Sequence, residues 1–319
     1  MKKSIFALSI IASIFVFSCS KNEKITVGSI IFNGAGEWFQ EALTGIRDAS
    51  KDLGVNLIEA DCHYDGTVES ELIHEQLKSK CDAIVICPLT EEESGKALSD
   101  ATAIGIPVVT WNTVVKPHPT SQIVVDSTML GRATGDYLVQ YVSQNEIKKL
   151  KTVLITNDFY SIGIERCKGF EDAILPLVEK GIVEIVGEAR LEHTEETKLS
   201  IKKMLEETPD IQFIWCWHQT SLLAVSEVLK EMNRSDILLA GTDMSVAIAR
   251  DMMGSDIKLI AVTTQQPYEL GYNALTNAVK AVKGEEIESQ IVIPTVTYTI
   301  DEQDALKEYV KTHAKFEAK

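Results

Sequence analysis

Residues 25–60 read ITVGSIIFNGAGEWFQEALTGIRDASKDLGVNLIEA, and this stretch decides the fold class. The β-branched run 25–31 predicts a strand. The apolar residues between Trp38 and Leu53 then recur every three or four positions, which predicts a helix with one apolar stripe. Gly54 ends that helix, and a second strand is expected at 55–60. Strand, helix and strand in this order indicate a βαβ unit of a parallel sheet.

The same alternation continues along the chain, so about ten strands are expected, too many for one open sheet of ordinary width. The sequence therefore predicts an α/β protein with two doubly wound parallel-sheet domains. The charged tail after Thr299 is expected to end in a surface helix. Further strands are expected at 83–87, 108–111, 123–125, 153–156, 183–186, 213–216, 237–240 and 259–263.

The N-terminus carries a targeting segment. Lys2 and Lys3 precede an almost wholly apolar run at 5–17, which is short for a membrane span and typical of a secretory signal. Cys19, which follows this run and Ser18, resembles the cysteine of a bacterial lipobox. That resemblance implies a signal peptide at 1–18, a lipidated linker at 19–24 and a membrane anchor through acyl chains on Cys19, each buried methylene contributing ~0.8 kcal/mol. An ordinary cleaved signal with a chance cysteine is the alternative.

Composition narrows the class of protein further. The 319 residues suit two domains of ordinary size, and with 45% hydrophobic and 24% charged residues they can fill two cores. The net charge of −16 argues against a nucleic acid partner, because lysines and arginines must replace the condensed counterions there.

Metal binding and disulfides are not favoured by the cysteines. Five remain after Cys19, so at least one is unpaired, and most adjoin apolar strands as small buried hydrophobes do. The spacing of Cys62, His63, His74 and Cys81 matches no familiar zinc pattern. We therefore expect no metal.

Motifs for cofactors and catalysis are also missing. The stretch NGAG at 33–36 follows a strand, but a dinucleotide fingerprint would need its third glycine where Phe39 stands. The chain contains no phosphate loop, nucleophile elbow or His-Glu-x-x-His helix. We expect no cofactor and no enzymatic activity, with a sugar hydrolase or isomerase as an alternative that turnover of a bound ligand would reveal.

Polar and aromatic residues follow the expected strands. In doubly wound sheets, ligands bind beyond the carboxyl ends of the strands, where this chain has, among others, Asn33, Trp111, His218 and Asp243. Amide and hydroxyl groups bond to ligand hydroxyls, and aromatic faces cover the apolar side of a sugar ring. The pattern therefore predicts binding of a small polar ligand.

Six short motifs occur in order along the chain: EWF at 37–39, DAIVICP at 82–88, GIPVVT at 105–110, GRATG at 131–135, GTD at 241–243 and QQPYELG at 265–271. Together they resemble the ribose/galactose-type (type I) periplasmic sugar-binding proteins, the substrate-binding components of ABC importers. The resemblance covers roughly residues 24–300.

The resemblance implies two lobes joined by three crossovers, near 111–112, at Gln265 and near Thr295. It places 25–111 with 266–294 in an N-terminal lobe and 112–265 with 295–319 in a C-terminal lobe. It also implies a protein that closes around a sugar and presents it to an ABC permease. We expect the protein to be a monomer. A membrane sensor such as a histidine kinase stays open as the partner. A transcription regulator with the same ligand domain would begin with a helix-turn-helix, where this chain has a secretion signal.

Ligand contacts follow from the same resemblance. Thr90 and Asn112 stand where the family usually has Asp, and His218 stands where Asn is usual. These departures leave open a ligand that lacks one of the usual hydroxyl groups or carries a ring or an amine instead. Residues 109–112 also resemble binding proteins for autoinducer-2. The full expected set is Asn33, Trp38, Phe39, Tyr64, Thr90, Trp111, Asn112, Arg166, His193, His218, Asp243 and Gln265, with Trp38 stacking on the sugar and Arg166 donating to it.

Overall fold

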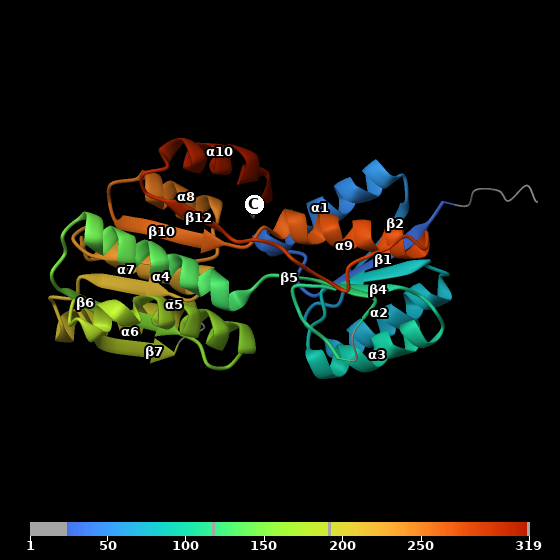
Figure 1. The fold of residues 1–319 in the computed structure, drawn as a ribbon, viewed down its shortest axis with the longest axis horizontal. Coiled ribbons are helices and arrows are strands. Elements are labelled where there is room, and N and C mark those ends of the chain that lie inside the picture. Colours follow the sequence, from blue (N-terminus) through green and yellow to red (C-terminus); the bar gives the residue numbers. More distant parts are fainter. Residues whose placement is uncertain (1–23, 117–118, 191–192, 318–319) are drawn as a thin grey trace, which may run out of the picture.

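A computed structural model describes residues 24–116, 119–190 and 193–317. The expected signal peptide and Cys19 lie outside these ranges. The described chain folds into two lobes that lie side by side, each a twisted sheet with helices on both faces (Figure 1). The predicted fold class is thereby confirmed.

The first lobe is built on a parallel sheet with the strand order β11-β5-β4-β3-β1-β2. Helices α1 and α9 pack together over one face, and α2 and α3 pack together over the other. The inner strands are apolar on both faces because both are covered by helices. The elements are β1 (Thr26–Ile31), α1 (Glu37–Leu53), β2 (Asn56–Asp61), α2 (Gly66–Lys78), β3 (Ala83–Ile86), α3 (Glu91–Ala103), β4 (Val108–Trp111), β5 (Ser121–Val124), α9 (Pro267–Val282) and β11 (Gln290–Val292).

The second lobe repeats the plan with the order β12-β10-β9-β8-β6-β7. Its strands are parallel except for β12, which runs antiparallel to β10 at the edge. The elements are α4 (Ser127–Gln144), β6 (Leu150–Thr156), α5 (Ser161–Glu179), β7 (Val183–Arg190), α6 (Thr194–Glu207), β8 (Phe213–Cys216), α7 (Gln219–Glu231), β9 (Leu238–Thr242), α8 (Val246–Met253), β10 (Lys258–Thr264), β12 (Val296–Thr299), α10 (Gln303–His313) and the 3-10 turn η1 (Ala314–Phe316).

Three crossovers join the lobes, between β5 and α4, between β10 and α9, and between β11 and β12. The second and third fall at the expected places, Gln265 and Thr295. The first does not, and the expected boundary after Trp111 is wrong. The strand β5 pairs with β4, with Trp111 opposite Ile123, so β5 and the Asn112 turn belong with the first lobe. Asn112 turns the chain back in a left-handed conformation, and its N–H donates to the Ile123 carbonyl.

Close helix packing explains the GRATG motif at 131–135. A Cβ on Gly131 of α4 would collide with the Arg166 carbonyl of α5, and a Cβ on Gly169 of α5 would collide with the Thr128 carbonyl of α4. Only glycine allows this approach, which fixes the position of α5 and therefore of the Arg166 side chain.

The C-terminal segment touches both lobes. Helix α10 packs on α8 of the second lobe with Leu306 and Tyr309 buried, while η1 contacts α1 of the first lobe. The end of the described chain therefore lies between the lobes (Figure 1). The expected helix after Thr299 is present, with one buried face.

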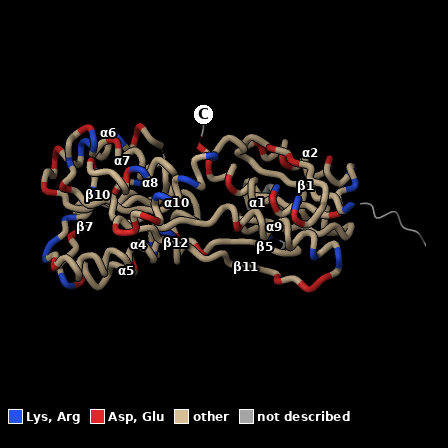
Figure 2. The backbone as a smooth tube through the Cα atoms, turned by 90° about the horizontal axis from the view of Figure 1, so that it is seen from above, with Lys and Arg blue, Asp and Glu red and all other residues tan. Residues whose placement is uncertain are grey.

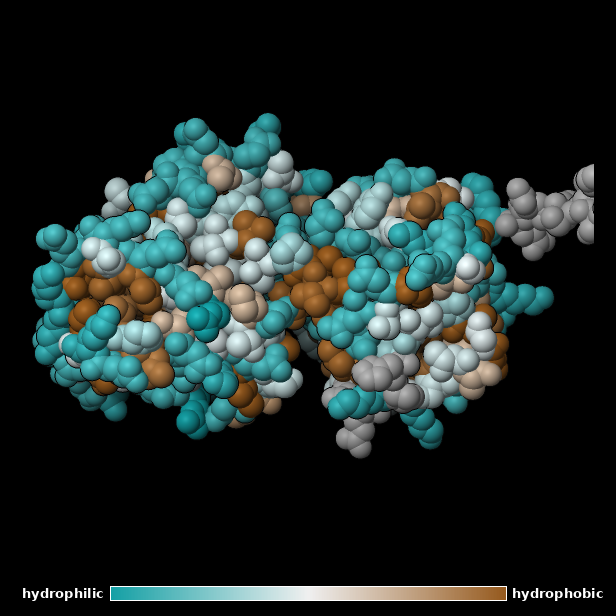
Figure 3. Space-filling view, in the orientation of Figure 1, coloured by the Kyte–Doolittle hydropathy of each residue, from teal (hydrophilic) through white to brown (hydrophobic). Residues whose placement is uncertain are grey.

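The surface is mixed in character. Lysines and arginines alternate with aspartates and glutamates around both lobes (Figure 2). Hydrophilic residues cover most of the face in Figure 3, with separate hydrophobic areas, one of them where the lobes meet. Within the three described ranges, no helix combines the length and the apolar character that crossing a membrane requires.

Candidate functional site

A cleft of about 670 Å³ opens between the two lobes. Its walls are the loops and helix starts that follow the carboxyl ends of the strands, together with one face of α7 (Gln219–Glu231). The first lobe contributes Phe32, Asn33, Gly36, Glu37, Trp38, Phe39, Tyr64 and Asn112, and the second contributes Ile162, Arg166, Thr194, His218, Gln219, Thr220, Leu223, Ala224, Glu227 and Asp243, with Gln265 at a crossover.

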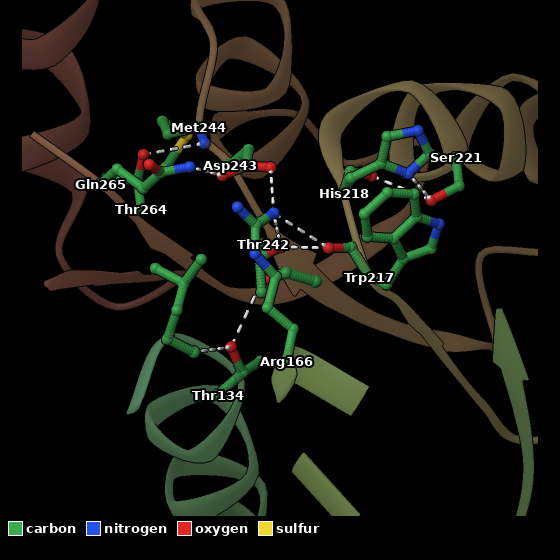
Figure 4. Close-up of polar contacts among 12 residues, drawn as sticks. Thr134, Arg166, Trp217, His218, Ser221, Thr242, Asp243, Met244, Thr264 and Gln265 are labelled. Carbon is green, nitrogen blue, oxygen red and sulfur yellow. Dashed lines mark hydrogen bonds and ion pairs between the residues drawn. The ribbon is translucent and has the colours of Figure 1, made fainter. Parts of the chain in front are cut away.

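A buried ion pair forms the wall of the second lobe. Arg166 Nη1 lies 2.7 Å from Asp243 Oδ2, and the two side chains are only 5% and 14% exposed. Gln265 Nε2 donates to Asp243 Oδ1 at 3.0 Å (Figure 4). Arg166 Nη1 also lies 3.3 Å from the Trp217 carbonyl and 3.4 Å from Thr242 Oγ1. The carboxylate and the guanidinium are each held in place by a second group.

Arg166 has a hydrogen-bond donor that the described residues do not use. Its Nε–H is buried and meets no acceptor among the described residues. Buried donors in proteins are nearly always bonded, so an unmatched one beside a cleft indicates a place for a ligand or solvent acceptor. A guanidinium offers five N–H donors in a fixed plane, and the bonds to Asp243 and its neighbours use Nη1.

Aromatic rings form the wall of the first lobe. Phe32 and Phe39 meet edge to face with centroids 4.8 Å apart, and Phe32 lies 5.2 Å from Tyr64. Trp38 packs edge to face on Phe39 at 4.9 Å and stacks on Trp111 at 5.8 Å. Such rings offer a large apolar surface with few rotatable bonds, which suits the C–H face of a ring-shaped ligand.

Three cleft residues hold a left-handed backbone, Tyr64 at φ 62°, Asn112 at φ 63° and Asp243 at φ 67°. Asn and Asp adopt this conformation more readily than other residues, whereas it is strained for Tyr. The backbone N–H groups of Asn112 and Asp243 donate to Ile123 and Thr263, which stabilises both turns. Strain of this kind gathers at binding and catalytic sites, where the surrounding structure enforces it.

His218 begins α7 at the rim of the second lobe. Its ring stacks on Trp217 with centroids 4.0 Å apart. Ser221 Oγ lies 2.9 Å from the His218 carbonyl oxygen and 2.9 Å from His218 Nδ1, so one hydroxyl holds both the backbone and the ring of this histidine (Figure 4).

Most of the residues expected from the sequence meet in this cleft. They are Asn33, Trp38, Phe39, Tyr64, Asn112, Arg166, His218, Asp243 and Gln265. Three others do not line it. Thr90 is exposed on the first lobe after β3, and His193 is exposed at the N-cap of α6, where its neighbour Thr194 faces the cleft instead. Trp111 is fully buried beneath Trp38 and Phe39, because its position in β4 points it into the core.

Several lining residues were missed. Phe32 follows β1 directly, so its place after a strand was an available signal. Gln219 and Thr220 start α7 after β8, and that position was a signal of the same kind. Ile162 and Leu223 gave none, because an apolar residue on a helix is read as core from the sequence alone.

The described cysteines and histidines do not gather into a metal site. Within the described ranges, no group of three or more His, Cys, Asp or Glu residues could hold a metal ion. The five cysteines of those ranges are free thiols and buried. Burial raises the pKa of Cys62 and of Cys167 to about 11, and raises that of Cys87 and Cys216 further.

Two α/β lobes, three crossovers and a polar, aromatic cleft between them define the class of two-lobed binding folds. The chain belongs to one family within it, the periplasmic binding protein domain family, whose profile matches residues 27–286. The resemblance inferred from the six motifs is confirmed.

Individual relatives agree with this assignment. The chain is 26% identical to the ABC transporter periplasmic-binding protein YphF of Escherichia coli, over 93% of this chain and 92% of YphF. It is 23% identical to the ribose import binding protein RbsB of the same species, over 91% of this chain and 96% of RbsB. Among solved structures, the arabinose-binding protein AraP of Geobacillus stearothermophilus shares the fold with a TM-score of 0.78 at 17% identity, covering 90% of this chain and all but 1% of AraP.

Proposed function

We propose that this protein captures a sugar or a related polyol by closing its two lobes, and that it delivers the solute to an ABC importer. The observation that carries the proposal is the pairing across one cleft of the Arg166–Asp243–Gln265 group with an aromatic wall that includes Trp38. Polar groups that both donate and accept face rings that cover apolar C–H groups, and a sugar ring has both kinds of surface.

A neutral ligand fits the charges of this group. The Asp243 carboxylate is matched by the Arg166 guanidinium, so neither is left to attract an ionic ligand. Glu227, at the rim, is paired with Lys198 at 2.5 Å. Hydroxyl groups can accept from the remaining Arg166 donors and donate to the carboxylate, and charged partners make these bonds stronger than neutral ones.

The relatives support the same ligand class. Those named for their ligands import ribose or D-apiose. Chains of the same fold were solved with D-allose and with myo-inositol bound. Polyhydroxylated five- and six-membered rings therefore form the first set to test.

Closure would couple binding to delivery. A ligand that touches both walls adds contacts available only when the lobes approach, so it stabilises the closed state. A membrane permease would then recognise the closed form. A membrane sensor could read the same form, and association of the loaded protein with either partner in membranes would distinguish the two roles.

The N-terminal segment supports a position outside the cytoplasm. Residues 1–18 are proposed as the signal peptide and Cys19 as the lipidated residue that holds the protein at a membrane surface, through the linker 19–24. Mass spectrometry of the mature N-terminus would give a diacylated or triacylated Cys19. An unmodified N-terminus at another residue would exclude the anchor.

Thermal shift with a ligand panel tests the binding proposal. Ribose, arabinose, allose, galactose, myo-inositol and nucleosides are added to the purified protein, and a binder at 100 times its Kd adds about 2.7 kcal/mol of stability. Arg166→Ala and Asp243→Ala should abolish the shift while far-UV circular dichroism stays native. Thr90→Ala, exposed and outside the cleft, is the matched control and should bind normally. The absence of any shift across the panel would contradict the proposal.

A further inference from the structure

The lobes also touch beside the cleft, through side chains of α1 as well as through the crossovers. Glu41 Oε1, on α1 of the first lobe, lies 3.4 Å from Nε2 of His313 at the end of α10 in the second lobe. Their side chains are 11% and 21% exposed. One turn earlier on α1, Glu37 Oε1 accepts a hydrogen bond of 3.2 Å from the Val246 N–H at the start of α8. Glu37 and Glu41 of the first lobe thus each contact a group of the second lobe.

The His313 ring is oriented by its own helix. Nδ1 lies 2.9 Å from the Tyr309 carbonyl, and the ring stacks on that of Tyr309 with centroids 3.8 Å apart. Nδ1 also lies 2.8 Å from Thr312 Oγ1, a hydroxyl that can donate or accept. On the other side Nε2 faces the Glu41 carboxylate, which can only accept, so this contact requires a proton on Nε2. When Nδ1 is protonated as well, the ring is a cation beside the carboxylate, and the contact is an ion pair.

The charges around this pair are mixed. Glu37 and Glu41 face it from α1, and Tyr298 of β12 and Tyr309 of α10 contribute phenol groups. Three further charges come from α8 and the C-terminal turn: Arg250 makes a two-pronged ion pair with Glu317 at 2.5 and 2.9 Å, and the Lys315 ammonium lies over the Phe316 ring.

These surroundings set the proton affinity of the histidine. Burial by itself would lower the pKa of His313, but the hydrogen bond to Glu41, its charge, the Tyr309 carbonyl and the charge of Glu37 outweigh burial and raise that pKa. At a pH below the ordinary pKa of histidine, His313 is therefore charged and its contact with Glu41 is an ion pair. The ion pair is lost as the pH rises past the raised pKa of His313.

We propose that Glu41 and His313 are positioning residues, a protonation-dependent clasp that fixes the angle between the lobes while His313 is charged. The clasp acts on the binding cleft through α1, since Glu41 is one turn from Trp38 on the same helix. A second cavity of about 300 Å³ beside the clasp shares Glu37, Trp38, Gln219 and Gln265 with the cleft, so the two regions are contiguous. Loss of the clasp would let the first-lobe wall move relative to Asp243.

Interlobe distances in the ligand-free full-length protein test the clasp. Lys78 on α2 and Lys203 on α6 are exposed and belong to different lobes. Replacing each with p-acetylphenylalanine allows two dyes to be attached without cysteine chemistry. Single-molecule energy transfer is then recorded in detergent at about pH 5.5 and about pH 8.5, on either side of the range in which histidine titrates.

The wild type should give a narrow distribution at the lower pH and a broader, shifted one at the higher pH. His313→Gln and Glu41→Gln should give the broad distribution at both pH values. His313→Lys stays charged and should give the narrow distribution at both pH values. His74→Gln is the matched control, because His74 also lies 3.4 Å from a carboxylate, that of Asp100, within one lobe. It should behave as wild type.

A wild-type distribution that does not change with pH, or a pH response retained in His313→Gln, would overturn the proposal. Circular dichroism of each variant separates loss of the clasp from loss of the fold, and the wild-type pH series needs no variant. No ligand is added, so the outcome is independent of whether the cleft binds a sugar.

Discussion

Arg166 and Asp243 stand 77 residues apart in the chain, and their charged groups meet at 2.7 Å on the wall of the interlobe cleft. Arg166 comes from α5, and Asp243 follows β9. Both belong to the second lobe, so the pair is assembled before any ligand or lobe movement contributes. Such preorganisation lowers the entropy that binding must overcome.

The first prediction concerns this ion pair. Asp243→Asn leaves Arg166 buried without its counter-charge, so we expect a loss of about 3–5 kcal/mol in the free energy of unfolding. The double variant Arg166→Met with Asp243→Asn removes both charges and should be more stable than Asp243→Asn alone. Urea denaturation measures both. Equal stability of the single and double variants would show that the buried charge carries no penalty.

The second prediction separates two stacked tryptophans. Trp38→Ala should weaken ligand binding about tenfold, close to 1.4 kcal/mol, because the ring covers one face of the ligand. Trp111 is fully buried, and Trp111→Ala should instead destabilise the fold by about 3–5 kcal/mol. Isothermal titration and urea denaturation distinguish the effects, with Trp38→Phe as the conservative control. The assignment fails if Trp38→Ala binds as tightly as wild type.

The third prediction concerns the approach of α4 to α5. Gly169→Ala forces a methyl group against the Thr128 carbonyl, so the helices must separate, at a cost of about 1–3 kcal/mol or more. Arg166 would move with α5, so ligand affinity should fall too. Gly254→Ala is the control, because its Cβ would lie 3.4 Å from the Asp251 carbonyl, at the edge of ordinary contact. Similar losses of stability in both variants would argue against a special role for Gly169.

The fourth prediction follows the raised pKa of His313. A group whose pKa is higher in the folded state than its ordinary value of 6.5 stabilises the fold fully below that value, and the contribution disappears as pH rises through the raised pKa. Wild type should therefore exceed His313→Gln in Tm by the most near pH 5.5, and the difference should shrink toward pH 9. Differential scanning calorimetry across this range gives the result. A difference that grows with pH would have the wrong sign.

The fifth prediction concerns the thiols. Burial raises the pKa of Cys62 and Cys167 to about 11, so at pH 8 they are protonated as well as shielded. Iodoacetamide should leave the cysteines of the described residues unmodified in the native protein and modify them all in 6 M guanidinium, as seen by peptide mass spectrometry. Rapid native labelling of Cys87 or Cys216 would contradict their burial in the core.

The order of strands and helices, the fold class and most of the cleft were predictable from the sequence. Apolar periodicity is a local signal, and the turns after the strands of a doubly wound sheet collect at one edge whatever the loops contain. Asn33 and Asp243 were therefore found together from their places after strands, whereas Arg166, inside α5, was expected only from the family resemblance. The lobe boundary after Trp111 was misplaced, since the short strand β5 gives no local sign of the sheet to which it belongs.

Tertiary structure decided which of the aromatic residues face the cleft and what joins the lobes. Both faces of an inner parallel strand are apolar, so the alternation that would orient Trp111 is absent, and only packing beneath Trp38 places it in the core. Glu41 and His313 lie near opposite ends of the chain, and no sequence pattern predicts that they meet. Their contact exists because the third crossover returns the chain to the second lobe, which brings α10 and η1 against α1.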